Sequence, residues 1–494
     1  MSSDRKTEER VKEEQLSPKI SLATNAAFNV LYKVLNVVFP LISAVYLARV
    51  LLPAGVGKIS YAQNIVSYMV LLGALGIPTY GVREVAKRRN SREATDKLFS
   101  EVLVINFCST SVALLLYAYL VVTYFSSDVP LYVACGLPIV FNYINVDWFY
   151  QGKEEYVYIA VRSILIKGLS VVAILLFVRS QSDYVTSALI SSLAICGNYV
   201  FNIVRARRYV TFTFHGLQLR QHLRPIFVLV ACAAGAQLYN NIDVLMLGAS
   251  QSSNVVGWYN NAQKVIGLVL TLATAISEVF LPRISYLYET DKERFDRLVS
   301  MGFRIVLFFA LPLTVGTVLV ANDLVVVMFG EPFRPAALTI QLLAPLVLIK
   351  GLGDIVSYQV IISSGQENRL LAAYFLAAAV NVALNMVLIL RFAQNGAALA
   401  SVVTELLVNA ILLHYSRRIL KVSLDWPFMI GTFLACVAMA VPMLVANFLV
   451  HNVFVGLFVD VVLAVITYFA FCLVTKNEVL LMIMDLVRKK KRPA

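Results

Sequence analysis

Charged residues are scarce in this chain. Asp, Glu, Lys and Arg make up 14% of its 494 residues, whereas soluble domains carry about 25%. Apolar residues reach 59%, and the mean hydropathy is +0.76. This composition excludes an ordinary soluble protein, leaves no room for a large soluble domain, and predicts that lipid is the main solvent. The net charge of +13 therefore bears on membrane orientation and not on nucleic-acid binding.

Motifs for catalysis, metal binding and nucleotide binding are missing. The chain contains neither HExxH nor GxxxxGK[ST], no DxD pair, and no CxxC among its six cysteines. Its four histidines are scattered, and its cysteines lie in apolar runs where they are expected to pack. The first 19 residues mix acids and bases, unlike a secretory signal. We therefore expect no enzyme, no cofactor, no metal site and no cleaved signal peptide.

Apolar runs long enough to cross a bilayer recur through almost the whole chain. A hydrocarbon core ~30 Å thick requires about 20 apolar residues per helix. The sequence therefore predicts an all-α integral membrane protein with about fourteen transmembrane helices. The expected spans are residues 20–48, 59–82, 98–124, 130–150, 159–178, 184–204, 225–247, 254–280, 298–320, 336–362, 369–390, 395–415, 427–450 and 453–474.

Basic residues are distributed unequally between the two sides of these spans. Of the 42 Lys and Arg residues, 32 lie in the terminal tails and in the connections after even-numbered spans, and 5 lie in the opposite connections. Bases concentrate on the cytoplasmic side of membrane proteins. We therefore expect cytoplasmic termini and an even number of spans. The basic connections 83–97 and 205–224 either only fix this topology or form short amphipathic helices on anionic lipid.

The chain also contains an internal echo at a separation of 200 residues. Val56-Gly57 and Ala62-Gln63 recur as Val256-Gly257 and Ala262-Gln263. Both copies lie at the start of an even-numbered span. A shift of six helices returns the chain to the same side, so the copies would be related by an axis along the membrane normal. This predicts two six-helix lobes with parallel topology.

Five longer segments carry a family resemblance. They are YLARVLLPAGVGKISYAQNIVSYMVLLGALGIPTYGVREV (46–85), NVDWFYQGKEEY (145–156), LPRISYLYETDKERFDRLV (281–299), VVVMFGEPFRPAA (325–337) and VNVALNMVLILRFAQNGAALA (380–400). Together they resemble the polysaccharide transporter family, which includes the Wzx-type O-antigen flippases. The resemblance extends from about residue 20 to residue 415, and the last two spans resemble only generic apolar helices.

This resemblance implies a multi-pass protein of the cytoplasmic (inner) membrane within the multidrug/oligosaccharidyl-lipid/polysaccharide exporter superfamily. It implies a central cavity, alternating access and a polyprenyl-pyrophosphate-linked glycan as substrate, with membrane lipids as partners and protons or sodium as coupling ion. The expected units are a cytoplasmic tail (1–19), an N-terminal lobe (20–204), a basic cytoplasmic linker (205–224), a C-terminal lobe (225–415), two additional transmembrane helices (427–474) and a basic cytoplasmic tail (475–494).

Such a substrate requires positive charge and polar groups inside the membrane. Lys33 and Lys264 lie near mid-span, where an unpaired cation costs ~2.5–3.5 kcal/mol on insertion scales. They are predicted to receive the phosphate linkage, and pairing with buried carboxylates is the alternative. For Arg304, near the end of its span, snorkelling to headgroups is an alternative to substrate binding. The other predicted substrate-binding residues are Lys350, Asn240, Asn241 and Asn260.

Carboxylates within the spans are candidates for ion coupling, because a buried carboxylate can exchange a proton or coordinate sodium. Asp354 follows Lys350 by four residues on one helix face, so a local ion pair is the favoured interpretation there. Glu278 lies near a span end, where snorkelling is again an adequate explanation. The candidates are Asp243, Glu278, Asp354 and Glu405, and Asp460 is a further carboxylate within a span.

Two other functions are weighed against the flippase. A multidrug-type antiporter of the same superfamily would need an acidic, aromatic cavity, and the mid-span lysines and the two extra helices disfavour it. A membrane enzyme that acts on the same glycans would need a large outer loop or metal ligands, and the sequence shows neither.

Overall fold

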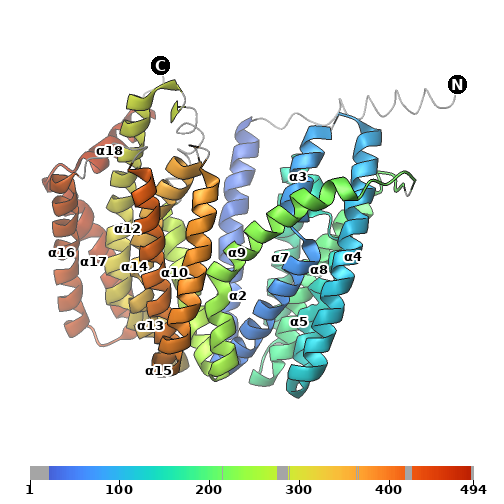
Figure 1. Ribbon diagram of the computed structural model, residues 1–494. Helices are drawn as coiled ribbons and strands as arrows, with labels where there is room; N and C mark the ends of the chain where they lie inside the picture. Colours follow the sequence, from blue (N-terminus) through green and yellow to red (C-terminus); the bar gives the residue numbers. More distant parts are fainter. Residues whose placement is uncertain are drawn as a thin grey trace.

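The computed structural model describes residues 22–490 except 89, 214, 275–286, 289, 363, 365 and 418–424. Within these residues the chain forms a bundle of long helices and no strand (Figure 1). The α-helices are α2 (Leu22–Ala74), α3 (Ile77–Arg88), α4 (Arg92–Tyr124), α5 (Val129–Phe141), α6 (Asp147–Gly152), α7 (Tyr156–Phe177), α8 (Tyr184–Ala206), α9 (Arg220–Ser250), α10 (Ser253–Thr274), α12 (Lys292–Phe329), α13 (Ala336–Leu343), α14 (Pro345–Asp354), α15 (Glu367–Ser416), α16 (Trp426–Leu449), α17 (Val453–Val474) and α18 (Glu478–Lys490). Short 3-10 turns η1 (Ser126–Asp128), η2 (Asn142–Ile144), η3 (Gln181–Asp183) and η5 (Glu331–Phe333) connect some of them, and the π-helix η6 (Ile355–Ile362) continues α14.

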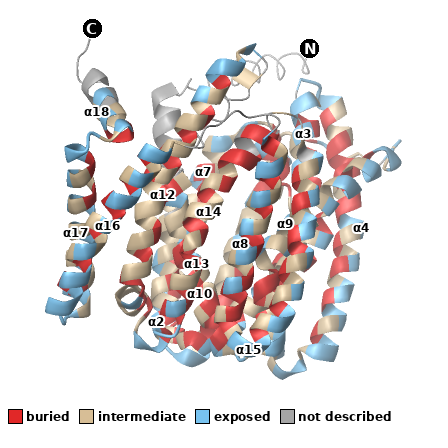
Figure 2. Ribbon diagram, turned by 60° about the vertical axis from the view of Figure 1, so that its left-hand side comes forward, coloured by how far each residue is buried: buried red, intermediate tan, exposed pale blue. Residues whose placement is uncertain are grey.

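The helices confirm an integral membrane protein. Eleven stretches in the described residues are long and apolar enough to cross a membrane. Two of these stretches each contain two straight helical segments, here called rods, because α2 bends at Leu52 and α15 bends at Ala393. Helix α10, with 22 residues, is not among the eleven stretches and is a further rod. Fourteen rods result, in the order of the predicted spans. Large apolar side chains such as Phe448 and Leu390 stay exposed, as expected for a chain solvated by lipid (Figure 2).

The bend in α2 corrects one predicted boundary. We expected a connection between residues 48 and 59, but the first rod ends at Leu52 (φ 57) and the second starts at Pro53. A residue before proline is disfavoured in the right-handed helical region, whereas proline fits the first turn of a helix. The two rods therefore follow each other across a single bent residue.

The two ends of the bundle differ in character (Figure 1). One end carries α3 and α18, and we call it the basic end. The opposite end carries the turns η1, η3 and η5, and we call it the short-loop end. Of the two interpretations of the basic connections, an amphipathic helix is present for part of 83–97, as the end of α3. Residues 207–219, apart from the undescribed 214, form no helix, which leaves the interpretation that these bases only fix the topology.

Helix α9 runs diagonally between two groups of helices (Figure 1). The first group consists of α2 to α8, the second of α10 and α12 to α15, and α16 and α17 pack outside α12. The start of α9 packs with the first group, since Ile226 lies in a cluster with Trp148 and Phe149. Leu247, near its end, lies in a larger cluster that contains residues of both groups. The packing of the first group thus extends beyond residue 224, where the predicted linker ends.

Candidate functional site

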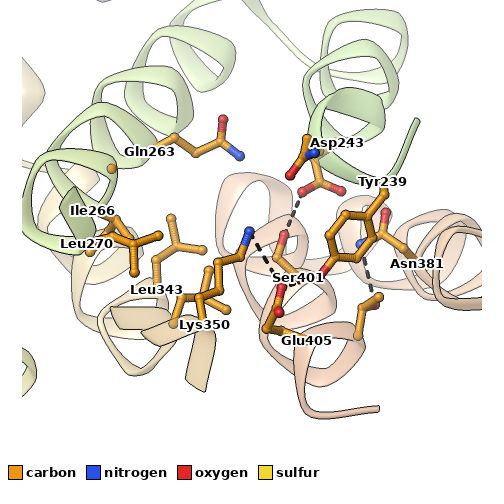
Figure 3. A pocket seen from close by; sticks show the side chains of 14 residues that line it. Tyr239, Asp243, Gln263, Ile266, Leu270, Leu343, Lys350, Asn381, Ser401 and Glu405 are labelled. Carbon is orange, nitrogen blue, oxygen red and sulfur yellow. Dashed lines mark hydrogen bonds and ion pairs between the residues drawn. The ribbon is translucent and has the colours of Figure 1, made fainter. Parts of the chain in front are cut away.

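A polar pocket of about 210 Å³ lies among the membrane-spanning helices of the second group (Figure 3). Helices α9, α10, α14 and α15 supply its polar side chains. Polar groups at this depth are costly unless they are paired or bind something, so their arrangement points to function. The polar lining consists of Tyr239, Asn240, Asp243, Gln263, Lys350, Asn381, Ser401, Thr404 and Glu405.

Helical periodicity explains why these residues meet. Tyr239 and Asp243 are one turn apart on α9, and Ser401 and Glu405 are one turn apart on α15. Residues four apart share one face of a helix. Each helix therefore presents two polar groups at successive levels of the pocket. The upstream half of α15 adds Asn381, and Asn385 one turn later, in the same way.

Asp243 is buried and accepts hydrogen bonds from three neutral donors. Tyr259 Oη donates at 2.6 Å, Asn385 Nδ2 at 2.6 Å and Ser401 Oγ at 2.5 Å (Figure 3 shows the Ser401 bond). Within the described part of the chain, no Lys, Arg or His lies within ion-pair distance of this carboxylate. The hydrogen-bond partners of Asp243 among the described residues are therefore all neutral.

A second carboxylate, Glu405, lies one turn further along α15. Lys350 Nζ is 3.5 Å from Glu405 Oε2, and Tyr239 Oη donates a hydrogen bond to the same oxygen. Lys350 Nζ also lies 5.5 Å from the centre of the Tyr239 ring, which stacks on Tyr374. Lys350, predicted to pair locally with Asp354, thus has a partner from another helix. The lysine of this pair is partly exposed, whereas the Glu405 side chain is nearly buried.

The structure brings several of the predicted residues together. Lys350, Asn240, Asp243 and Glu405 line one pocket. Lys264 is exposed, with Nζ 3.5 Å from the Asn261 side-chain oxygen, and it directly follows the lining residue Gln263.

Other predicted residues lie elsewhere or beyond description. Arg304 does not line the pocket and pairs with Asp425 and Glu478, each at 2.6 Å. Asn241 accepts a hydrogen bond from Asn64 through its backbone carbonyl. The Asn260 side-chain oxygen is buried without a hydrogen-bond partner. The Lys33 side chain and all of Glu278 lie outside the described residues. Asp354 is half-buried at the end of α14.

Sequence reasoning missed most of the partners of Asp243. Asn385 and Ser401 were not singled out, and neither was Asn381. One signal was available, since Asn381 and Asn385 are spaced by a helical turn within an apolar span. The described residues contain no group of three or more His, Cys, Asp or Glu side chains that could hold a metal.

At the short-loop end, α2 and α10 touch through their backbones. A Cβ atom on Gly57 would lie 1.7 Å from the carbonyl oxygen of Ser253, and one on Gly257 would lie 2.1 Å from that of Pro53. The two contacts are equivalent under the 200-residue repeat, since Gly57 corresponds to Gly257 and Pro53 corresponds to Ser253. Arg49 adds a hydrogen bond of 2.5 Å to the carbonyl oxygen of Val327 at the end of α12. The first and second groups are therefore joined tightly at this end.

Comparison with known families gives two matches, each to more than half of the chain. Residues 22–288 match the family described as polysaccharide biosynthesis protein, and residues 198–469 match the lipid II flippase MurJ family. Among proteins of similar sequence, the "Putative O-antigen transporter" of Escherichia coli (strain K12) is 23% identical over 412 residues, which are 81% of this chain and 98% of that protein. The "Probable flippase AglR" of Haloferax volcanii is 28% identical over 169 residues, 34% of this chain and 35% of that protein.

Solved structures show the same fold. The lipid II flippase MurJ in an inward closed conformation superposes with a TM-score of 0.73 at 14% identity, over 91% of this chain and all of that one. A MATE multidrug transporter in its inward-facing conformation gives a TM-score of 0.61 at 14% identity, over 77% of this chain and 94% of that one. These relatives are transporters and flippases, not enzymes. The predicted all-α membrane fold is confirmed, and the chain belongs to the polysaccharide biosynthesis protein family and also matches the lipid II flippase MurJ family.

Proposed function

We propose that this protein is a flippase that carries polyprenyl-pyrophosphate-linked oligosaccharide units across the cytoplasmic membrane for surface polysaccharide biosynthesis. The observation that carries the proposal is the polar pocket inside a transporter of this family, with Lys350 and Glu405 paired in its wall. The names of the relatives support the substrate class. They include an O-antigen transporter, a flippase of low-salt glycan biosynthesis and the lipid II flippases.

The side chains fit the chemistry of such a substrate. Sugar hydroxyls need donors and acceptors in equal measure, and the amide and hydroxyl groups of Asn240, Gln263 and Thr404 offer both. The phosphate linkage needs cations. Lys264 is exposed beside the pocket, and Lys350 would exchange Glu405 for phosphate. Lys33 on α2 remains the predicted third cation.

Transport would proceed by alternating access between two lobes, proposed as residues 20–204 and 225–415, with α16 and α17 peripheral. The reciprocal contacts of Gly57 and Gly257 support a two-fold relation between the lobes. They also form a tight seam at the short-loop end. Opening the pocket to that side would require α2 and α10 to separate there.

Ion coupling is assigned in this proposal to Asp243. Asp243 accepts hydrogen bonds from three neutral donors and has no cationic partner among the described residues, so it can bind a proton or a sodium ion. Oxygen atoms are the ligands that hard cations prefer, and the Asn385 side-chain oxygen beside it is buried without a hydrogen-bond partner. Glu405 is the second candidate, and its pairing with Lys350 makes it less available. Asp354 and Glu278 remain predictions.

The orientation proposed here places the basic end in the cytoplasm. The 32 bases on one side against 5 on the other support this, as do α3 and α18 at that end. Both termini would then be cytoplasmic. A C-terminal alkaline phosphatase fusion should be inactive, and an active one would contradict the orientation.

A multidrug-type antiporter is the alternative that one observation favours. The pocket lining contains two carboxylates and one lysine, together with Tyr239, which suits an organic cation. The family match and the two additional helices α16 and α17 favour the glycan instead.

Deletion of the gene tests the two functions directly. A flippase mutant should lose a surface polysaccharide and accumulate the lipid-linked unit on the cytoplasmic side. Purified protein in proteoliposomes should then move that lipid-linked glycan and not an organic cation such as ethidium. Normal polysaccharide with ethidium sensitivity in the deletion strain would overturn the flippase proposal in favour of the antiporter.

A further inference from the structure

Asp460 is a buried carboxylate that does not line the proposed transport site. It lies on α17, one of the two additional helices, and its exposed fraction is 0%. Neither of its carboxylate oxygens has a hydrogen-bond partner. Buried polar atoms in proteins are nearly always paired, and an ionisable residue inside a membrane span is expensive to keep. Its presence therefore calls for a bound group that satisfies these oxygens.

A second carboxylate, Asp323 of α12, faces the same place. Its Oδ2 atom lies 3.4 Å from the position that a Cβ would occupy on Gly456. Gly456 and Asp460 are four residues apart, so they share one face of α17. Asp323 lies six residues before the end of α12 and Asp460 seven residues after the start of α17, which places both about 10 Å from the short-loop end of their helices. The two carboxylates thus lie at one depth.

The surroundings supply no compensating charge. Helix α16 contributes the neutral amide of Asn447, which lies near Asp460 without hydrogen-bond geometry. Arg334, at the short-loop end near Asp323, is paired with Glu331 at 2.6 Å. Helix α18 meets the opposite end of α17, and no other described Lys, Arg or His forms an ion pair with either aspartate. The Asp323 carboxylate thus approaches the face of α17 that carries Asp460, and a neighbouring like charge in a low dielectric disfavours ionisation of both groups.

We propose that Asp323 and Asp460 form a proton-binding site between α12 and α17. One proton lies between the two carboxyl groups, so that one is the donor and the other the acceptor. This satisfies an oxygen of Asp460 and removes one negative charge from the helix interface. The site is separate from the polar pocket, whose lining includes no residue of α12 or α17. It does not depend on the glycan substrate.

A hydrophobic fluorescent carbodiimide tests the site, because it reacts with protonated carboxyl groups within membranes. The full-length protein in proteoliposomes is labelled across a pH series, and the labelled peptides are identified by mass spectrometry. We expect the Asp460 peptide to be labelled at pH 7, where an ordinary aspartate is ionised. Absence of labelling at every pH at which the protein stays folded would overturn the proposal.

Two variants distinguish a proton that Asp460 shares with Asp323 from protonation of Asp460 that is caused by burial alone. Asp323→Asn removes the neighbouring negative charge, so labelling of Asp460 at pH 7 should fall about tenfold or more. Asp485→Asn, an exposed carboxylate on α18, should leave it unchanged. Unchanged labelling in Asp323→Asn would contradict a shared proton. If sodium ions protect Asp460 from labelling at constant pH, the site binds a metal cation and the proton-binding proposal is wrong. Monodispersity and thermal unfolding of each variant verify that it is folded.

Discussion

The two helix groups differ in how a buried charge is matched: in the first group the buried Arg162 has a carboxylate partner, whereas in the second group the buried Asp243 has only neutral donors. In the first group, Asn142 donates to Asn106 at 3.2 Å and to Thr110 at 2.8 Å, and Arg162 pairs with Asp147 at 3.2 Å. In the second group, Asp243 has only neutral donors, and the side-chain oxygen of Asn385 is unpartnered.

This difference distinguishes structure from function within one fold. A saturated network of neutral amides or a closed ion pair holds helices together and offers nothing to a ligand. A buried carboxylate without a cationic partner, beside a pocket, can stabilise a bound ion or substrate. We therefore expect substitutions in the first group to act on stability and those in the second group to act on transport. The predictions below run from the largest to the smallest expected effect on transport per folded molecule.

Asp243→Asn should have the largest effect. The amide removes the negative charge and brings an NH₂ group toward the donors Tyr259 and Ser401. Lost stabilisation of a bound cation by about 3 kcal/mol corresponds to a loss of roughly a hundredfold in ion-coupled transport. Flipping of a fluorescent lipid-linked glycan in proteoliposomes with an imposed ion gradient measures it. A folded variant that retains coupled transport would remove Asp243 from the mechanism.

Gly257→Ala should have the next largest effect, because its Cβ would collide with the carbonyl oxygen of Pro53 across the seam between the two groups. The seam should open, transport should fall, and a cysteine placed at Asn240 should react faster with an impermeant maleimide from the short-loop side. Gly316→Ala is the matched control, since nothing lies within 4 Å of its Cβ position. Both substitutions raise helix propensity by about 1 kcal/mol. Equal transport and equal maleimide reactivity in the two variants would therefore argue against the seam as a gate.

Lys350→Gln should reduce transport about tenfold, since a hydrogen bond to a charged group contributes about 1.5–3 kcal/mol. Lys350→Arg should retain more activity because it keeps the charge. The Michaelis constant for the lipid-linked substrate should rise in the Gln variant. If Lys350 serves only to neutralise Glu405, the double variant Lys350→Gln with Glu405→Gln will restore transport, which would exclude a direct phosphate contact.

Asp147→Ala should have the smallest effect on transport and a clear effect on stability. It leaves the buried Arg162 without its ion-pair partner, and the loss of a hydrogen bond to a charged group costs about 1.5–3 kcal/mol. The unfolding temperature and the yield should drop, while transport per folded molecule stays near that of the original chain. A specific loss of transport with normal stability would show that the first group also has a functional charge site.

The transmembrane architecture follows from the sequence because each span must by itself supply about 20 apolar residues and satisfy its own backbone. This is local information, and all fourteen expected spans overlap a helical rod. The local rule fails where a helix only bends, as at Leu52.

The site depended on the tertiary structure, because its partners come from helices far apart in the chain. Sequence reasoning identified Asp243 and Glu405 as costly buried charges, but their environments differ only through contacts with Ser401, 158 positions after Asp243, and with Lys350. Arg304 is equally costly by sequence, yet Asp425 and Glu478 neutralise it at the basic end. A sequence shows which polar groups lie in the membrane, whereas packing decides which of them remain free to bind, because pairing depends on distances of a few ångströms between separate helices.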